Sequence, residues 1–314
     1  MSYEGKNFPS GTIGCDALNI PAALIKQITE LCGSLNLFMG AMQLGMANAE
    51  LFISARESAL QIVHKLKDIP PFSYLDEKRI TAHIQKIFST EYLENAMTYA
   101  KSLASGNLMN ALDPQYQKAL TLLRVVPVLA HLSYSLEQFQ NTMLQFAESL
   151  NTAEQERSPS GYAVSFGDFF SSNPSLSEED GSWMSLTNTS VQYVPAIQPG
   201  SDTPQLVKRM HYVFFVGMFR SDFFEGLFVG HAPKKCPICR RWFLTTNARH
   251  TKYCGNLAPG ISSIELAARL ETCKEGHNVN LLMTILSSRF MNAAVTPLTG
   301  MSSVELSMLT LPNI

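Results

Sequence analysis

The chain has 314 residues, of which 46% are hydrophobic, so it is long enough for two domains or one large one and can bury a real core. Its formal net charge of −2 excludes a protein whose overall charge attracts polyanions. The charge is unevenly distributed: residues 201–254 hold 9 basic and 3 acidic side chains, net +6, whereas residues 151–200 hold 1 and 6, net −5.

The first residues do not resemble a signal peptide, because no basic segment precedes an apolar core. A long uncharged run, residues 31–49, is long enough to raise the question of a membrane span. Glycine and polar residues interrupt this run, so we expect a buried helix there and no membrane partner. We expect a cytoplasmic location, where thiols stay reduced and clustered cysteines favour a metal ion over disulfides.

Residues 1–157 are expected to form a multi-helical N-terminal domain. Apolar side chains recur at helical spacing, and proline or capping residues mark the ends of the segments. Nothing in this half indicates a ladder of strands, and no internal repeat is present. The expected helices are, in chain order, 47–67, 77–88 capped by Asp76, 91–103, one that opens at Asp113 and Pro114 and is kinked or broken at Pro127, and 135–150.

Residues 158–203 have a different composition, with 11 serines among 46 residues and the acidic run Glu178–Asp180. Such a composition does not readily bury a core, so this segment is expected to be a linker or a long excursion. Three apolar groups within it are candidates to dock on a neighbouring surface: Phe166–Phe170, Trp183 and Val191–Ile197.

Residues 204–280 are expected to hold a helix followed by a zinc-ribbon module. Thr203 is a plausible N-cap with Pro204 at the first helical position, and a helix rich in phenylalanine would run from there to the cysteines. Such a helix is apolar nearly all round and is therefore expected to be buried. The tail, residues 281–314, is poor in charge, and two interpretations stay open: a buried helix plus a strand, or an altered form of an ancestral C-terminal end.

Four cysteines have spacings typical of a structural zinc site. Cys236 and Cys239 form a C-x-x-C pair, 14 residues separate Cys239 from Cys254, and 18 residues separate Cys254 from Cys273. Zn²⁺ prefers four thiolate or imidazole ligands in a tetrahedron, and two cysteines two residues apart can bind one ion from a tight turn. Residues 242–244 would form the outgoing strand of a short hairpin and residues 251–254 the returning strand.

The spacing of the residues does not by itself decide which one is the fourth zinc ligand. Cys273 completes a Cys₄ site, whereas His250 would give a Cys₃His site and His277 is a further candidate. The alternative to a metal site is that the chain binds no metal and holds these cysteines as buried or surface thiols. Cys15 and Cys32 lie far from the cluster and are expected to be small buried hydrophobic residues.

A cluster of basic side chains surrounds these cysteines. Four thiolates and one Zn²⁺ carry a net charge of −2, so part of the positive charge balances the site and the remainder suits a nucleic-acid backbone. A solvated basic face is the alternative. The six candidate nucleic-acid-binding residues are Lys234, Lys235, Arg240, Arg241, Arg249 and Lys252.

The stretches "CPICRRWFLTT", "TKYCGN" and "TCKEGHNVN" resemble the C-terminal zinc-ribbon signature of an uncharacterised bacterial family, a domain of unknown function. They are also distantly similar to the CGNR zinc fingers of presumed bacterial transcription regulators. The resemblance covers roughly residues 205–280, and it implies that Cys236, Cys239, Cys254 and Cys273 are the ligands. Two positions depart from the pattern: Arg240 replaces the glycine of many zinc knuckles, and "CGNL" lacks the arginine of CGNR.

No motif for catalysis is present: the chain has no Walker A loop, no dinucleotide fingerprint, no H-E-x-x-H and no G-x-S-x-G. His64, His83 and His131 stand singly in helical segments and are expected to be satisfied or exposed. We therefore expect a mainly α protein with a small C-terminal zinc ribbon, a structural Zn²⁺ and no enzymatic role. The first hypothesis is a nucleic-acid-binding or regulatory protein, and the alternative is a protein-interaction module.

Overall fold

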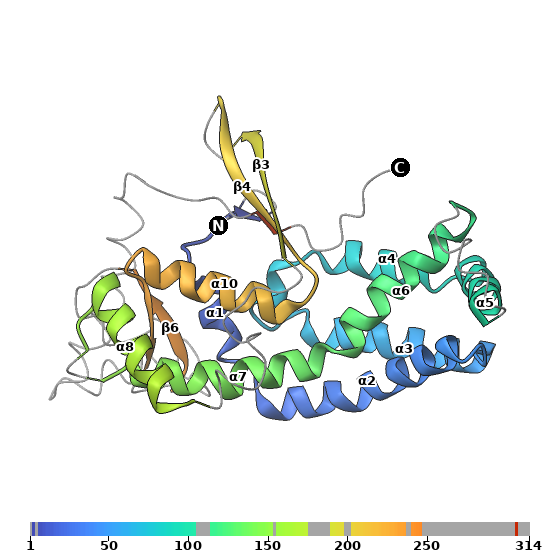
Figure 1. Cartoon of the computed structure of the whole chain (residues 1–314), viewed down its shortest axis with the longest axis horizontal. Helices are drawn as coiled ribbons and strands as arrows, with labels where there is room; N and C mark the ends of the chain where they lie inside the picture. Colours follow the sequence, from blue (N-terminus) through green and yellow to red (C-terminus); the bar gives the residue numbers. More distant parts are fainter. Residues whose placement is uncertain are drawn as a thin grey trace, which may run out of the picture.

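The structure is a computed structural model that describes residues 2–3, 6–104, 114–152, 155–174, 189–197, 202–236, 240–246 and 305–306. Over these residues the protein is mainly helical, with a small strand region towards its C-terminal end (Figure 1). The helices are α1 (Thr12–Ala17), α2 (Ala22–Gln43), α3 (Ala49–Leu66), α4 (Glu77–Ile87), α5 (Thr90–Ala104), α6 (Gln117–Ala130), α7 (Leu132–Ser149), α8 (Pro159–Ser172) and α10 (Phe215–Phe228).

The helices expected in the first half are confirmed, and local chemistry explains their ends. The Asn48 side chain caps α3 by accepting a hydrogen bond from the N–H of Leu51, and the Asp76 side chain caps α4 in the same way. Pro127 lies inside α6, and the axes of the helical pair on either side of His131 are bent by 41°. α6 thus continues through Pro127, and the break that separates it from α7 falls at His131, four residues after the proline.

Residues 31–49 do not form one continuous helix, because α2 ends at Gln43 and α3 begins at Ala49. One face of α2 is buried, whereas Leu37 on the opposite face is exposed. Within the described ranges no single helix is long and apolar enough to cross a membrane, although the bent pair Pro114–Ala130 and Leu132–Ser149 together meets the same length and composition limits.

Phenylalanine side chains join α8 and α10 to the helical body. Phe146 of α7 is fully buried, and its ring centroid lies 5.3 Å from those of Phe166 and Phe169 on α8. It also lies 6.0 Å from the ring of Phe223 on α10. The expectation that residues 166–170 dock on a neighbouring surface is therefore confirmed. The described parts of 158–203 form a packed helix and a strand.

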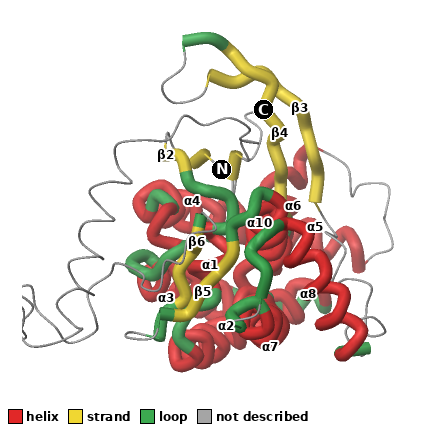
Figure 2. Tube along the Cα trace, turned by 90° about the vertical axis from the view of Figure 1, so that its left-hand side faces the viewer, coloured by secondary structure: helices red, strands yellow, loops and turns green. Residues whose placement is uncertain are grey.

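Residues 204–212 correct the expected helix. They form the strand β4 (Pro204–Tyr212), which pairs along its full length with β3 (Thr189–Ile197), and the helix α10 begins only at Phe215. Val207 and Met210 are the buried residues of β4, and their spacing of three imitates a helix in the sequence. The β3–β4 hairpin stands out from the helical body (Figures 1 and 2).

β4 also pairs with a short strand of the C-terminal tail. A five-stranded sheet has the order β2-β1-β7-β4-β3, in which β1 (Ser2–Tyr3) and β4 both pair in parallel with β7 (Glu305–Leu306). β2 (Lys6–Asn7) pairs with β1. The sheet thus brings residues from the two ends of the chain together beside the long hairpin.

A buried carboxylate fixes α10 against α1. Asp222 is 5% exposed, and its side-chain oxygens accept hydrogen bonds from the backbone N–H groups of Gly11 (3.1 Å) and Gly14 (2.9 Å). Gly14 is required at this crossing, because a Cβ atom there would lie 2.7 Å from the carbonyl oxygen of Phe219. The helix that leads into the cysteine segment is therefore held by the N-terminus of α1.

Candidate metal centre

The first candidate metal ligand lies at the end of a short hairpin. The strands β5 (Ala232–Lys235) and β6 (Trp242–Thr245) pair antiparallel, with Lys235 opposite Trp242 and Ala232 opposite Thr245. The Thr245 hydroxyl also donates to the Ala232 carbonyl, at 2.8 Å. The expected strand at residues 242–244 is confirmed, but its partner in the described structure precedes the cysteines, and residues 251–254 lie outside the described ranges.

The hairpin is held against the helical body, where Figure 2 shows β5 and β6 beside α1. The Asn19 side-chain amide donates to the Trp242 carbonyl at 2.8 Å, and the Trp242 N–H donates to the Asn19 side-chain oxygen at 2.7 Å. Asn19 therefore satisfies both backbone groups of Trp242, as a neighbouring strand would. The Trp242 side chain is buried in the main core.

Two backbone hydrogen bonds join the chain on either side of residues 237–239. The N–H of Cys236 donates to the carbonyl of Arg241 at 2.9 Å, and the N–H of Arg240 donates to the carbonyl of Cys236 at 2.9 Å. Arg240 has a φ of 59°, the left-handed conformation that glycine adopts most easily. Many zinc knuckles have glycine at the position of Arg240. The backbone of Arg240 has the conformation that a glycine would favour.

The described structure reaches one of the four expected ligands. The Cys236 side chain is 2% exposed. Cys239, Cys254 and Cys273 lie outside the described residues, as do the alternatives His250 and His277. Over the described ranges no three His, Cys, Asp or Glu side chains are grouped closely enough to hold a metal ion.

The basic residues around the hairpin differ in their surroundings. The Lys235 ammonium lies 3.2 Å from a carboxylate oxygen of Glu148 and 5.4 Å from the centre of the Trp242 ring, so it is engaged within the molecule. Lys234 is half-buried, whereas Arg240 and Arg241 are exposed. Arg249 and Lys252 lie outside the described residues.

The other cysteines and helix histidines singled out in the sequence lie in different surroundings. Cys15 and Cys32 are buried, 1% and 2% exposed, as expected; burial raises the pKa of the Cys15 thiol, and the Cys32 thiol donates to the Leu129 carbonyl. His64 and His131 lie on helix surfaces. His83 differs from the expectation, because its Nε2 atom is buried and has no hydrogen-bond partner.

The fold and the hairpin define a mainly helical protein that carries a small strand module near its C-terminal end. Residues 184–280 match the model of a family of unknown function, DUF6076. The matched range begins before β3 and includes β4, α10, β5 and β6, and it agrees with the resemblance to an uncharacterised domain. No curated protein and no solved structure shows significant similarity to the chain.

Proposed function

We propose that the chain binds one structural Zn²⁺ through Cys236, Cys239, Cys254 and Cys273. The observation that carries the proposal is the pair of backbone hydrogen bonds that join Cys236 to Arg240 and Arg241, with the Cys236 side chain buried beside them. They bring together the chain on either side of residues 237–239, and such an approach favours binding of one ion by both thiolates of a C-x-x-C pair. The zinc would then tie the hairpin to the segment near Cys273, in place of a core too small to fold alone.

Four thiolates leave no open coordination position for a substrate, so the proposed role of the metal is structural and not catalytic. The anchored hairpin supports this role. Trp242 and Lys235 are fixed on the helical body through Asn19, Asn151 and Glu148. Such contacts hold one side of the proposed site rigid before the metal arrives.

Metal analysis of the purified full-length chain tests the proposal. We expect one zinc per chain in the wild type, loss of zinc in Cys236→Ser and Cys273→Ser, and retention in His250→Ala. Cys32→Ser is the matched control, because Cys32 is an equally buried thiol far from the hairpin. A wild-type chain purified without zinc, and unable to take it up, contradicts the proposal.

A second role, nucleic-acid binding by the basic face, is supported by Arg240 and Arg241. Both are exposed beside these hydrogen bonds of Cys236, and neither forms an ion pair with a carboxylate of the described residues. Duplex DNA binding measured over a series of salt concentrations tests this role. Binding that weakens steeply with salt, and is reduced in Arg240→Ala/Arg241→Ala, supports it; no binding at low salt contradicts it.

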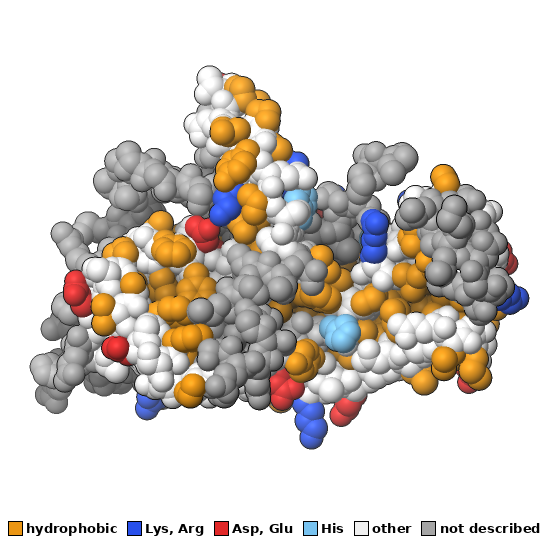
Figure 3. Space-filling model, viewed as in Figure 1, with side chains coloured by type: hydrophobic (Ala, Val, Ile, Leu, Met, Phe, Trp, Pro, Cys, Tyr) orange, Lys and Arg blue, Asp and Glu red, His pale blue; other side chains and the backbone are white. Residues whose placement is uncertain are grey.

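The alternative, a protein-interaction module with a purely structural zinc, is supported by the β3–β4 hairpin. Val191, Tyr193, Ile197 and Leu206 are exposed, and the strand register places them on one face of the hairpin. Figure 3 shows hydrophobic side chains exposed along the projecting β3–β4 hairpin. Because the same face is present on every copy, two chains can pair through it about a twofold axis. Sedimentation of wild type and Tyr193→Ser/Leu206→Ser tests this, and a monomeric wild type contradicts it.

A further inference from the structure

A large apolar groove lies between α4 and α6, and no residue of the β5–β6 hairpin lines it. Its volume is about 900 Å³, and its walls come from α3, α4, α6 and the connection from β4 to α10. Apolar side chains dominate the lining, among them Ile62, Leu66, Ile80, Leu129 and Phe215. Figure 3 shows hydrophobic side chains gathered between α6 and the N-terminal end of α10. Sites for small molecules in proteins commonly have volumes of about 300–1,000 Å³.

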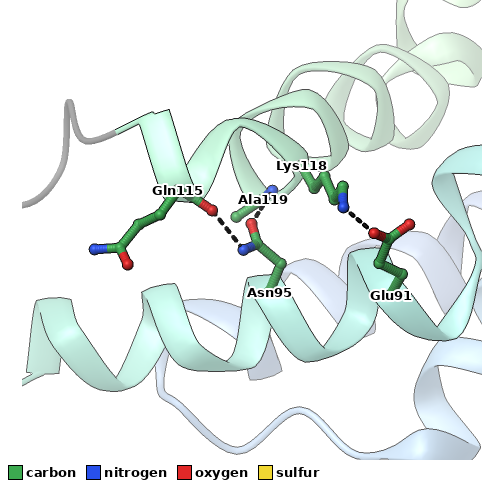
Figure 4. Close-up of polar contacts among 5 residues, drawn as sticks. All are labelled: Glu91, Asn95, Gln115, Lys118 and Ala119. Carbon is green, nitrogen blue, oxygen red and sulfur yellow. Dashed lines mark hydrogen bonds and ion pairs between the residues drawn. The ribbon is translucent and has the colours of Figure 1, made fainter.

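The walls of the groove are fixed by contacts outside it. The Asn95 side chain of α5 donates to the Gln115 carbonyl at 2.7 Å and accepts from the Ala119 N–H at 2.8 Å, so it holds the first turn of α6 (Figure 4). An ion pair between Lys118 and Glu91 adds to this contact. On the other wall, the buried side chain of Ile87 anchors α4 in the core. The groove is therefore preformed and does not depend on a ligand to assemble it.

The rim of the groove carries positive charge that is only partly compensated. Arg79, His83 and Lys86 are four and three residues apart, which places them on one face of α4, and Arg124 faces the same groove from α6. Lys86 and Arg124 are exposed, and neither has an ion-pair partner among the described residues.

The acidic side chains of the rim, Asp76 and Glu77, already have partners within the protein. The Glu77 carboxylate lies 3.6 Å from the ammonium of Lys67, and the Asp76 carboxylate accepts from the Arg79 N–H at the start of α4. Lys86, in the last turn of α4, and Arg124 of α6 are therefore available to an anionic group.

Two polar groups within the groove lack their usual partners. The Nε2 atom of His83 is buried without a hydrogen bond, which commonly costs about 1–3 kcal/mol. Burial, with Lys86 and Arg79 nearby, lowers the pKa of His83, so its ring is neutral at neutral pH and has one donor and one acceptor nitrogen. In α6, Pro127 has no N–H to donate to the carbonyl of Leu123, and both residues line the groove.

We propose that this groove binds an amphiphilic small molecule that has one anionic head group, such as a carboxylate, and an apolar body of the size of an acyl chain. The apolar body lies between α3, α4 and α6, where burial of its methylene groups provides most of the affinity. The head group lies at the rim of the groove, where Lys86 and Arg124 supply positive charge and His83 supplies a polar group. This site is independent of the proposed zinc centre, since no residue is common to both.

The test is fluorescence titration of the full-length protein with cis-parinaric acid and, separately, with its uncharged methyl ester. The wild type is expected to bind the acid more tightly than the ester. Lys86→Glu and Arg124→Glu should each weaken acid binding by about tenfold, which corresponds to loss of one charge-assisted contact, and leave ester binding unchanged. Lys78→Glu is the matched control, because Lys78 is exposed on α4 but does not line the groove.

A variant that fills the groove tests the location of the apolar body. Ile80→Trp places a larger side chain in the groove and is expected to weaken binding of acid and ester alike, with an unchanged circular dichroism spectrum showing that the variant is folded. No saturable binding to the wild type overturns the proposal. Equal affinity of the wild type and Lys86→Glu for the acid, or unchanged binding to folded Ile80→Trp, also overturns it.

Discussion

Asn19 and Trp242, 223 residues apart in the chain, are joined by two reciprocal hydrogen bonds between the Asn19 amide and the backbone of Trp242. One side chain on the helical body thus provides the pairing that a third strand would give to β6. It is the contact that links the fold most directly to the candidate metal centre.

Asn19→Ala is expected to destabilise the protein by about 2–3 kcal/mol, because it leaves a donor and an acceptor of Trp242 without partners. Urea unfolding measures the loss. In a Trp183→Phe background, a red shift of the remaining tryptophan emission should report release of the hairpin. Asn36→Ala is the control, because the Asn36 amide donates only one long hydrogen bond, 3.5 Å from the Ala130 carbonyl. An equal loss in both variants contradicts the special role of Asn19.

Asp16 is expected to make stability depend on pH. Burial raises its pKa to about 6, the hydrogen bond from Tyr74 lowers it in part, and Asp222 raises it. A raised pKa means that the folded chain holds the proton more tightly, so this stabilisation is complete below the unfolded value of 3.8 and is lost as pH rises through about 6. The difference corresponds to about 3 kcal/mol.

Unfolding free energies at about pH 4 and about pH 7, compared between wild type and Asp16→Asn, isolate this contribution. The wild type should lose about 2 kcal/mol more than the variant over that interval, because at pH 4 part of the full difference is already lost. Asp68→Asn, an exposed carboxylate replaced in the same way, should follow the wild type. If Asp16→Asn has the same pH dependence as the wild type, Asp16 does not titrate as described.

Arg240→Gly is expected to stabilise the turn at the cysteine pair by about 1 kcal/mol, because glycine adopts the left-handed conformation without strain from a Cβ atom. Arg240→Val, which is β-branched, should destabilise it. Thermal or chemical denaturation checks both. Arg241→Gly, one residue later and without a positive φ, should give no gain. A gain of similar size in Arg241→Gly would show that the effect is not conformational.

Phe146→Ala is expected to cost about 3–5 kcal/mol, since it removes a fully buried ring that contacts α8 and α10. Hydrogen exchange should show that the amides of α8 lose protection more than those of α2. Phe228→Ala replaces a phenylalanine that is 74% exposed and should change stability by less than about 0.5 kcal/mol. Retained protection in α8 would show that the helix does not depend on this cluster.

The sequence predicted elements whose signals are local. Asp76 marks the start of α4, because its side chain caps the first turn, whereas the interruption expected at Pro127 falls four residues later, at His131. β4 was mistaken for helix because its partner strand, which lies several residues earlier in a serine-rich segment, decides its conformation. The spacing of Val207 and Met210 did not reveal that pairing.

Contacts between distant segments left no pattern in the sequence. The approach of Asn19 to Trp242 depends on α1, α10 and β6 being packed together, and an asparagine after a short helix gives no sign of it. The groove is similar, because its lining comes from four separate segments. His83 could be singled out only as one histidine on a helix; the structure adds that its Nε2 atom is buried without a partner.

The central claim, that the cysteines bind one structural Zn²⁺, is tested most directly by the zinc content of the full-length chain, measured by mass spectrometry after removal of loosely bound metal. The account predicts one zinc per chain in the wild type and Cys32→Ser, and none in Cys236→Ser. A wild-type protein that holds no zinc, or a Cys236→Ser protein that keeps it, would contradict the account.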